Sequence, residues 1–331
     1  MKKFFSMVLV LSMVLSLGLL SACGTTNDGG EKEALKLGLG VHATASATDA
    51  TEDKPGQGQA TATVAAVLVD NEGKIVSAFI DCADNKVSYN ADGTAVAAAS
   101  FATKYEQGDA YGMVAYGGAA KEWYEQADAF CALIAGKTVD EVKALVADDN
   151  RGTEEVVNAG CTVYVSDFAL AIEKAVANAT DSGATAADTL KIGVYTAQST
   201  GDATEDKDGS NQVEITAFAA AIDANGKITA ASSDCLQVKF TFDLTGASTF
   251  DATKALATKK EQGDAYNMVA YGGAGMEWYA QAAAFDALCV GKNVAEVGAL
   301  VGADNYGTED VVAAGCTILV DGFVKAASKL G

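Results

Sequence analysis

A threonine follows a turn of small residues at two places in the chain, and each precedes a predicted helix. The two segments are Asn-Ala-Gly-Cys-Thr-Val at 158–163 and Ala-Ala-Gly-Cys-Thr-Ile at 313–318. A helix start supplies unpaired N–H groups and the positive end of the helix dipole, and both suit a phosphate. A threonine hydroxyl held there can carry a phosphate ester. Thr162 and Thr317 are therefore the first candidates for chemistry.

A polar, glycine-rich run also occurs twice, at 107–118 and 262–273. The run is too polar to form a core. Its glycines let backbone N–H groups approach a ligand, and its tyrosines can face a planar ring. The run is therefore predicted to line a binding site, whereas the nearby Trp123, at helical spacing, is expected in a core. The candidate residues are Tyr111, Met113, Tyr116 and Gly117, and their counterparts Tyr266, Met268, Tyr271 and Gly272.

Composition argues against several other chemistries. The 331 residues include 44 acidic and 23 basic side chains, and this excess of negative charge repels a nucleic-acid backbone. The chain has one histidine, so multi-histidine metal cages are excluded; His42 aligns with Ala197 and is expected to be structural. The segment Gly38–Gly40 lacks the third glycine of a dinucleotide fingerprint and predicts strand geometry. No acidic run has the spacing of a calcium loop, so no metal site is expected.

Six of the cysteines sort by their place in a repeat. Cys82 aligns with Cys235 and Cys161 with Cys316, whereas Cys131 and Cys289 align with other residue types. No spacing is Cys-x-x-Cys, which argues against zinc and thioredoxin-type sites. A link such as Cys82 to Cys161 and a set of buried free thiols are both compatible with the sequence.

The first residues have the pattern of an export signal. An apolar run at 4–20 follows two lysines and ends in small residues before Cys23. That ending resembles the bacterial lipobox, in which the cysteine is lipidated and becomes the mature N-terminus. An ordinary secretory signal with an incidental cysteine is the alternative. We expect 1–22 to be removed, Cys23 to carry the lipid, and 23–34 to form a flexible tether.

The mature chain is a tandem duplication. Residues 103–119 match residues 258–274 at a constant offset, and Glu-Trp-Tyr follows each run. The repeating unit is about one domain long, so a short-period solenoid is excluded. The predicted organisation is a first domain at 35–179, a linker at 180–189 and a second domain at 190–331.

Within each unit the pattern changes from strands to helices. Residues 60–82 alternate around a turn at 70–74, and a further hairpin is expected at 90–93. Strands followed by helices predict an α+β fold, with antiparallel strands followed by packed helices. The predicted helices cover 119–135, then a second from the capping box at Thr138 through Leu145, then 167–179 with Ser166 as N-cap.

Four motifs together resemble a known family. They are the Asp-x-x-Gly-Lys-Ile turn, the Thr-Lys-x-Glu-x-Gly-Asp-x-Tyr-x-Met run, Glu-Trp-Tyr with a downstream Gly-Lys-x-Val, and the small-residue segment before Thr162 and Thr317. Nearly all of both units is similar to flavin-binding lipoproteins built on the FMN-binding domain. The likeness is greatest to the two-domain electron-transfer lipoproteins of Gram-positive bacteria.

The resemblance implies two covalent FMN groups, one per unit. In that family a separate flavin transferase joins FMN phosphate to a threonine, and the matching positions here are Thr162 and Thr317. A literal Ser-Gly-Ala-Thr run also ends at Thr185, but it lies in the linker and precedes a strand. Thr185 is therefore the second-choice acceptor.

The resemblance also implies a function. The chain is expected to be a flavoprotein anchored by lipid to the outer face of the cell membrane. It would relay electrons from a membrane quinone or an NADH-dehydrogenase-linked donor to extracellular acceptors, and it would need no general base. The alternative is a surface lipoprotein without redox chemistry that binds a peptide or small solute beside Tyr111 and Tyr266, the duplication then serving avidity.

Overall fold

The computed structural model of the chain describes residues 33–98 and 100–330. The expected signal at 1–22 and the expected lipidation site Cys23 lie outside the described residues, as does most of the expected tether. Within the part of the chain that is described, no helix is long and apolar enough to cross a membrane.

The first half begins with three long antiparallel strands and continues with short helices. The five-stranded sheet has the order β4-β3-β2-β1-β5. Its strands are β1 (Lys36–Thr48), β2 (Gly56–Val69), β3 (Ile75–Tyr89), β4 (Ala95–Val96) and β5 (Thr180–Asp181). The helices are α1 (Lys104–Gln107), the 3₁₀ helix η1 (Gly108–Tyr111), α2 (Trp123–Ile134), α3 (Val139–Lys143), α4 (Glu154–Ala159) and α5 (Ser166–Ala177).

The second half repeats this order of strands and helices, and its sheet has the order β6-β7-β8. The strands are β6 (Thr189–Gly201), β7 (Gly209–Ile222) and β8 (Ile228–Phe242). The helices are α6 (Lys259–Gln262), η2 (Gly263–Tyr266), α7 (Trp278–Cys289), α8 (Val294–Gly298), α9 (Glu309–Ala313), α10 (Asp321–Ala327) and η3 (Ser328–Leu330). The structure is thus α+β with antiparallel sheets, as the sequence predicts.

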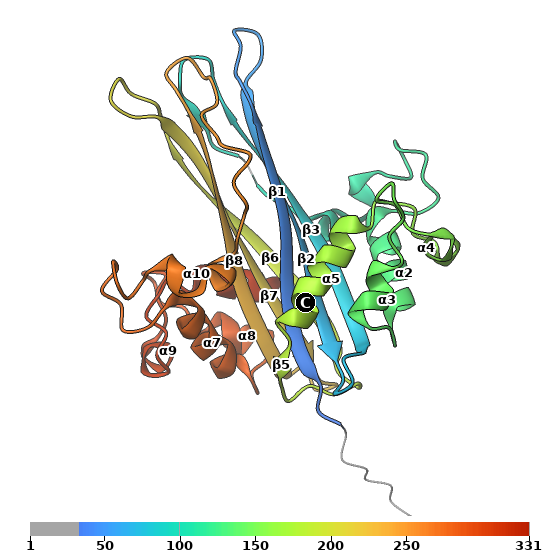
Figure 1. Ribbon diagram of the computed structural model, residues 1–331. Coiled ribbons are helices and arrows are strands. Elements are labelled where there is room, and N and C mark those ends of the chain that lie inside the picture. The colour runs from blue at the N-terminus through green and yellow to red at the C-terminus, as the bar shows by residue number, and fades with distance from the viewer. Residues whose placement is uncertain (1–32, 99, 331) are drawn as a thin grey trace, which may run out of the picture. The chain divides into compact units, whose positions relative to one another are not determined.

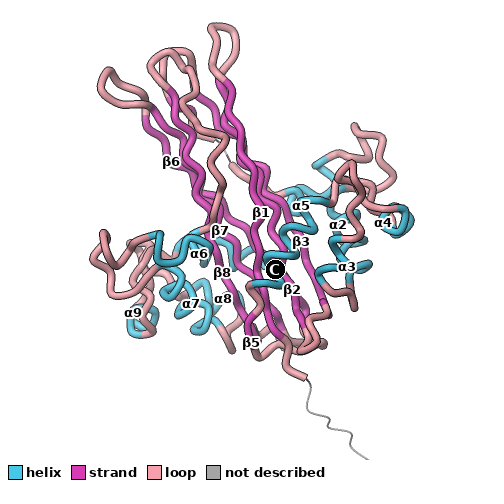
Figure 2. Tube along the Cα trace, viewed as in Figure 1, coloured by secondary structure: helices cyan, strands magenta, loops and turns pink. Residues whose placement is uncertain are grey.

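The two sheets pack face to face, and the helices of each half cover the outer face of its own sheet (Figures 1 and 2). One hydrophobic core lies between the sheets and takes side chains from both halves, among them Leu39, Val64, Ile192 and Ile215. Two further cores lie between each sheet and its helices. Each long strand is therefore buried on both faces for much of its length, which explains the near-continuous apolar run in β2. The halves share a core, a feature that the sequence does not indicate.

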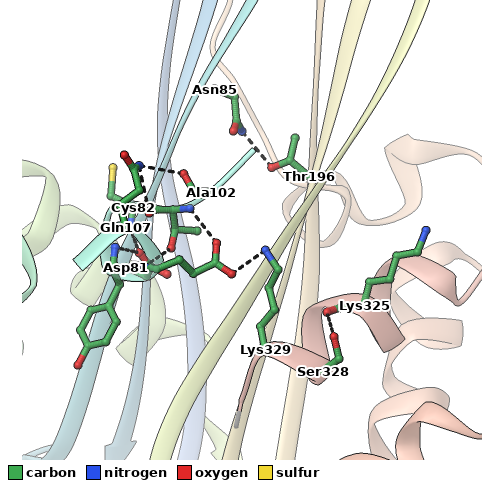
Figure 3. Close-up of polar contacts among 12 residues, drawn as sticks. Asp81, Cys82, Asn85, Ala102, Gln107, Thr196, Lys325, Ser328 and Lys329 are labelled. Atoms are coloured by element: carbon green, nitrogen blue, oxygen red, sulfur yellow. Dashed lines mark hydrogen bonds and ion pairs between the residues drawn. The ribbon is translucent and has the colours of Figure 1, made fainter. Parts of the chain in front are cut away.

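Contacts between the halves come in equivalent pairs. Lys174 Nζ lies 2.6 Å from a carboxylate oxygen of Glu261, and Lys329 Nζ lies 2.8 Å from one of Glu106, which is the same pair with the halves exchanged. Figure 3 shows Lys329 extending from η3 toward the strands. Reciprocal pairing of this kind is the property of an isologous two-fold interface.

The hairpin loops at the far end of the sheets repeat the same reciprocity. Ala50 N–H donates to Gly246 O at 2.8 Å, and Ala203 N–H donates to Gly93 O at 2.8 Å. The buried rings of Tyr89 and Phe242, which are equivalent in the two halves, stack on each other with centroids 4.3 Å apart. The two halves therefore associate as the subunits of a symmetric dimer do. One departure from symmetry is a buried hydrogen bond from Asn85 to Thr196 at 3.1 Å (Figure 3).

Strand pairing corrects one alignment. His42 lies opposite Thr63 on β2, and Tyr195 lies opposite Thr216 on β7. Thr63 and Thr216 in turn lie opposite the two equivalent cysteines of β3 and β8. The counterpart of His42 is therefore Tyr195, and the expected match with Ala197 is wrong. The reason is that the segment joining the last long strand to the first helix is longer in the second half, so strands and helices repeat at different offsets.

Most local predictions agree with the structure. In the turn at 70–74 the Asp70 carboxylate accepts the N–H groups of Glu72 and Lys74. The turn at 90–93 leads into β4. The capping box at Thr138 is present, although α3 ends at Lys143 and not at Leu145. The prediction that Ser166 caps the next helix is wrong, because Ser166 is already the first residue of α5.

Candidate functional site

Each half contains a cavity between the outer face of its sheet and its helices. The cavity of the second half measures about 560 Å³ and that of the first about 320 Å³. Seven equivalent lining positions have the same residue type in both. They are Thr63, Cys82, Lys104, Tyr111, Met113, Trp123 and Phe168, and correspondingly Thr216, Cys235, Lys259, Tyr266, Met268, Trp278 and Phe323.

The two candidate acceptor threonines lie at the rim of these cavities. Thr317 lines the larger cavity itself, and Val163 and Tyr164, which follow Thr162, line the smaller one. Both threonines are exposed. An exposed hydroxyl beside a cavity is accessible to a modifying enzyme, and a group attached to it can enter the cavity.

A buried glutamine positions each hydroxyl. Thr162 donates to Gln126 Oε1 through Oγ1 at 2.9 Å and through its backbone N–H at 2.8 Å. Thr317 makes the same pair of hydrogen bonds to Gln281, at the same distances. Each glutamine is 1% exposed, and its amide donates to a backbone carbonyl just before the helix, which fixes its orientation. Sequence reasoning missed these glutamines, although both follow Glu-Trp-Tyr at the same spacing.

The expected placement of the threonine at a helix start is only partly correct. The helix α5 begins at Ser166, so Thr162 lies on the loop that precedes it and outside its first turn. Asp167 and Phe168 of that first turn do line the cavity.

The glycine-rich runs are held by the glutamate of Glu-Trp-Tyr. The carboxylate of Glu122 accepts the N–H groups of Met113 and Val114 at 2.8 and 3.0 Å. Glu277 does the same for Met268 and Val269 in the second half. The motif therefore shapes the loop that brings a tyrosine and a methionine to each cavity.

The sequence candidates divide into two groups. Tyr111, Met113, Tyr266 and Met268 line the cavities. Tyr116 and Tyr271 are 92% and 88% exposed and lie outside both linings, as do Gly117 and Gly272. Trp123, expected as core, and its counterpart Trp278 belong to the core and also form part of the cavity wall.

The second-choice acceptor Thr185 lies elsewhere. It starts a tight turn in which its backbone N–H donates to Asp188 at 2.8 Å, and its hydroxyl accepts from the N–H of Ala187 at 3.3 Å. Ser182, three residues earlier, donates through Oγ to Leu35 O, just before β1 begins. Thr185 lines neither of the two equivalent cavities.

All six cysteines of the described residues are unbridged, so the link from Cys82 to Cys161 is not formed in this structure. Burial raises the pKa of the Cys82, Cys161 and Cys316 thiols to about 11, and it also raises the pKa of the other three. These thiols are therefore protonated at neutral pH and are poor nucleophiles.

A lysine contacts the aromatic wall of each cavity. Lys104 Nζ lies 5.4 Å from the ring centre of Tyr111 and 5.6 Å from that of Trp123. Lys259 occupies the equivalent place, with distances of 5.5 and 5.3 Å to the corresponding rings. Among the residues described, no cluster of three or more His, Cys, Asp or Glu is arranged to hold a metal ion.

A buried aspartate anchors the helix that carries each lysine. Asp234 Oδ1 accepts the backbone N–H of Cys235 at 2.7 Å and that of Lys260, at the start of α6, at 3.2 Å. Asp81 makes the same contacts in the first half (Figure 3). Burial raises the pKa of Asp234 from its ordinary value of 3.8 to about 6, although its hydrogen bonds and Lys260 lower it.

We predict a pH-dependent effect of Asp234→Asn on stability. A carboxyl group whose pKa is raised by folding stabilises the fold fully below its ordinary pKa, and this contribution is lost as pH rises through about 6. The free energy of unfolding of the variant, relative to wild type, should therefore rise by about 2 kcal/mol between pH 4 and pH 7, at 1.36 kcal/mol per pKa unit. Urea unfolding of both proteins across this pH range measures the difference.

Asp223→Asn serves as the contrast. Asp223 lies in an exposed turn, where hydrogen bonds from the Lys227 backbone and from Asn225 lower its pKa. Its contribution is present above the ordinary pKa and is lost as pH falls, so this variant should show the opposite trend with pH. Parallel trends for the two variants would contradict the assignment of Asp234.

The chain matches no family model, and comparisons with curated proteins and with solved structures found no similar protein.

Proposed function

We propose that this chain is a lipid-anchored extracellular flavoprotein that relays electrons through two FMN groups bound covalently to Thr162 and Thr317. The donor would be a membrane quinone or an NADH-dehydrogenase-linked system, and the acceptors would lie outside the cell. A flavin transferase would attach the FMN. The observation that carries the proposal is the duplicated arrangement of an exposed threonine, fixed by a buried glutamine, at the rim of an aromatic cavity.

The residues present fit a flavin joined through its phosphate. A phosphate on the Thr317 hydroxyl would lie at the mouth of a cavity of about 560 Å³, which falls in the usual range for a bound cofactor. Tyr266, Trp278 and Tyr195 supply aromatic wall for a planar ring. When bound, the flavin supplies the redox chemistry, so the protein needs no acid–base residue of its own.

The protein's own residues would position the group and set its environment. Gln126 and Gln281 fix the attachment points, and the Glu122 and Glu277 carboxylates hold the loops that bring Tyr111 and Tyr266 to the cavities. A covalent link suits a protein outside the cell, where a cofactor that dissociates is lost by dilution.

The test is the mass of the intact protein after production together with a flavin transferase. The proposal expects a yellow protein that stays yellow when denatured and carries two FMN groups. Loss of all flavin on denaturation would contradict the covalent attachment. A protein that stays colourless with transferase and FMN present would favour the alternative, a surface lipoprotein that binds a peptide or small solute in the same cavities.

A further inference from the structure

The lysines at the two cavities differ in their counter-ions. Lys259 Nζ lies 2.9 Å from a carboxylate oxygen of Glu214, and this lysine is 6% exposed. Thr61 takes the place of Glu214 in the first half, and no ion pair within 4 Å joins Lys104 to any carboxylate of the described residues. Lys104 is a protonated cation at neutral pH. Burial lowers its pKa, but its neighbours Cys82, Tyr111 and Asp84 outweigh this and the pKa is raised.

Two more cations lie beside the acceptor threonine of the first half only. Arg151 Nη1 donates to Thr162 O at 3.0 Å, and its Nε lies 4.0 Å from Asp149. The Lys121 ammonium lies over Gly160, where a Cβ would overlap it. In the second half the side chain over the equivalent glycine is that of Met276. Tyr306 lies at the position of Arg151, since both pair with the loop that carries the acceptor threonine.

The carboxylates do not cancel this difference. Asp167 lines the first cavity, 3.7 Å from His42, and Asp84 lies nearby on β3 but accepts from Gln59 and Thr61 and does not line the cavity. The second cavity is lined by two carboxylates, Glu214 and Asp321, and Lys325 Nζ lies 3.1 Å from Asp321. Glu214 also faces Lys259 directly at 2.9 Å, whereas no carboxylate of the described residues lies within 4 Å of Lys104, so the lysine of the first site is the less neutralised of the two.

We propose that the two flavins differ in reduction potential, the one in the first half being the stronger electron acceptor, so that electrons pass from the second half to the first. This rests on the proposed function. Reduction adds negative charge to the flavin ring, so a nearby cation stabilises the reduced form and a nearby carboxylate destabilises it. The transfer is balanced: two electrons leave the reduced carrier on Thr317 and reduce the oxidised carrier on Thr162, with protons exchanged with water.

The experiment measures the potential of each site separately. Thr317→Ala leaves the flavin of the first half, and Thr162→Ala leaves that of the second. Spectroscopic titration against redox dyes should give the more positive potential for the first half. The expected difference is at least tenfold in the equilibrium constant for two-electron exchange, about 30 mV.

Two further variants assign the difference to the named residues. Glu214→Thr, which places the residue of the first half into the second, should make the potential of the second site more positive. Lys104→Gln should make that of the first more negative. Lys54→Gln, which removes a lysine of an exposed hairpin loop, should change neither.

Each outcome decides the proposal. Equal potentials, the reverse order, or a Glu214→Thr variant whose potential is unchanged would overturn it while leaving the flavoprotein function intact. The absence of covalent flavin from the singly substituted proteins would instead overturn the proposed function itself. If Lys104→Gln does not fold, the comparison of the two sites and the Glu214→Thr variant still decide.

Discussion

Thr162→Ala and Thr317→Ala should each remove one of two covalent flavins, and the double variant should carry none. The reason is that each side chain supplies the one exposed hydroxyl that Gln126 or Gln281 holds at a cavity rim. The mass of the denatured protein and its visible absorbance per chain measure the loss. Each single variant should retain half of the wild-type absorbance.

The loss should not come from unfolding. The backbone N–H of residue 162 still donates to Gln126 in the variant, so about 1 kcal/mol of stability at most is lost with the hydroxyl. The control is Thr185→Ala, which should keep both flavins because Thr185 lies in a turn away from both cavities. Full loading of Thr162→Ala and Thr317→Ala, with loss in Thr185→Ala, would move the attachment to the linker.

Gly40→Ala should lower the free energy of unfolding by about 3 kcal/mol or more. The helix α5 crosses β1 so closely that a Cβ at Gly40 would overlap the Ala171 carbonyl oxygen and the Ala175 nitrogen. Because these atoms are backbone, the whole helix must move away from the sheet, and overpacking of this kind typically costs 1–3 kcal/mol or more. Urea unfolding measures the change.

A second strand glycine provides the matched control. At Gly201 on β6 the nearest atom to an added Cβ is Ser210 Oγ, at 3.6 Å, which is ordinary contact. Gly201→Ala should therefore leave stability within about 0.5 kcal/mol of wild type. The equivalent of Gly40 in the second half is Gly193, where a Cβ would overlap Ala326 O, and Gly193→Ala should be as destabilising as Gly40→Ala. Similar unfolding of all three variants would contradict the close helix contact.

Much of the local structure is readable from the sequence because short-range rules determine it. The Asp70 turn, the Thr138 capping box and the strand character of Gly38–Gly40 depend on residues within a few positions of one another. The repeat is equally visible, because two matching runs of this length require no knowledge of the fold. The placement of Tyr111 and Met113 in the cavity lining is also predicted from these repeated runs.

The misalignment of His42 shows where this reasoning fails. The offset of the helical motifs does not hold for the strands, because the connection between strands and helices differs in length between the halves. Only the pairing of His42 opposite Thr63 and of Tyr195 opposite Thr216 shows which strand residues are equivalent. The sequence does not show the proximity of Lys259 to Glu214 for a different reason: the pair spans 45 residues and joins a helix to a strand.

The sequence by itself determined the duplication, the α+β order of elements and the residues that recur in both halves. Tertiary structure alone decided that the two sheets share one core, that a buried glutamine holds each exposed threonine, and that Glu214 neutralises one of two equivalent lysines. The physical reason is the distance along the sequence over which each kind of interaction acts. Turns, caps and hydrophobic periodicity are local, whereas burial and ion pairing depend on which distant surfaces the folded chain brings into contact.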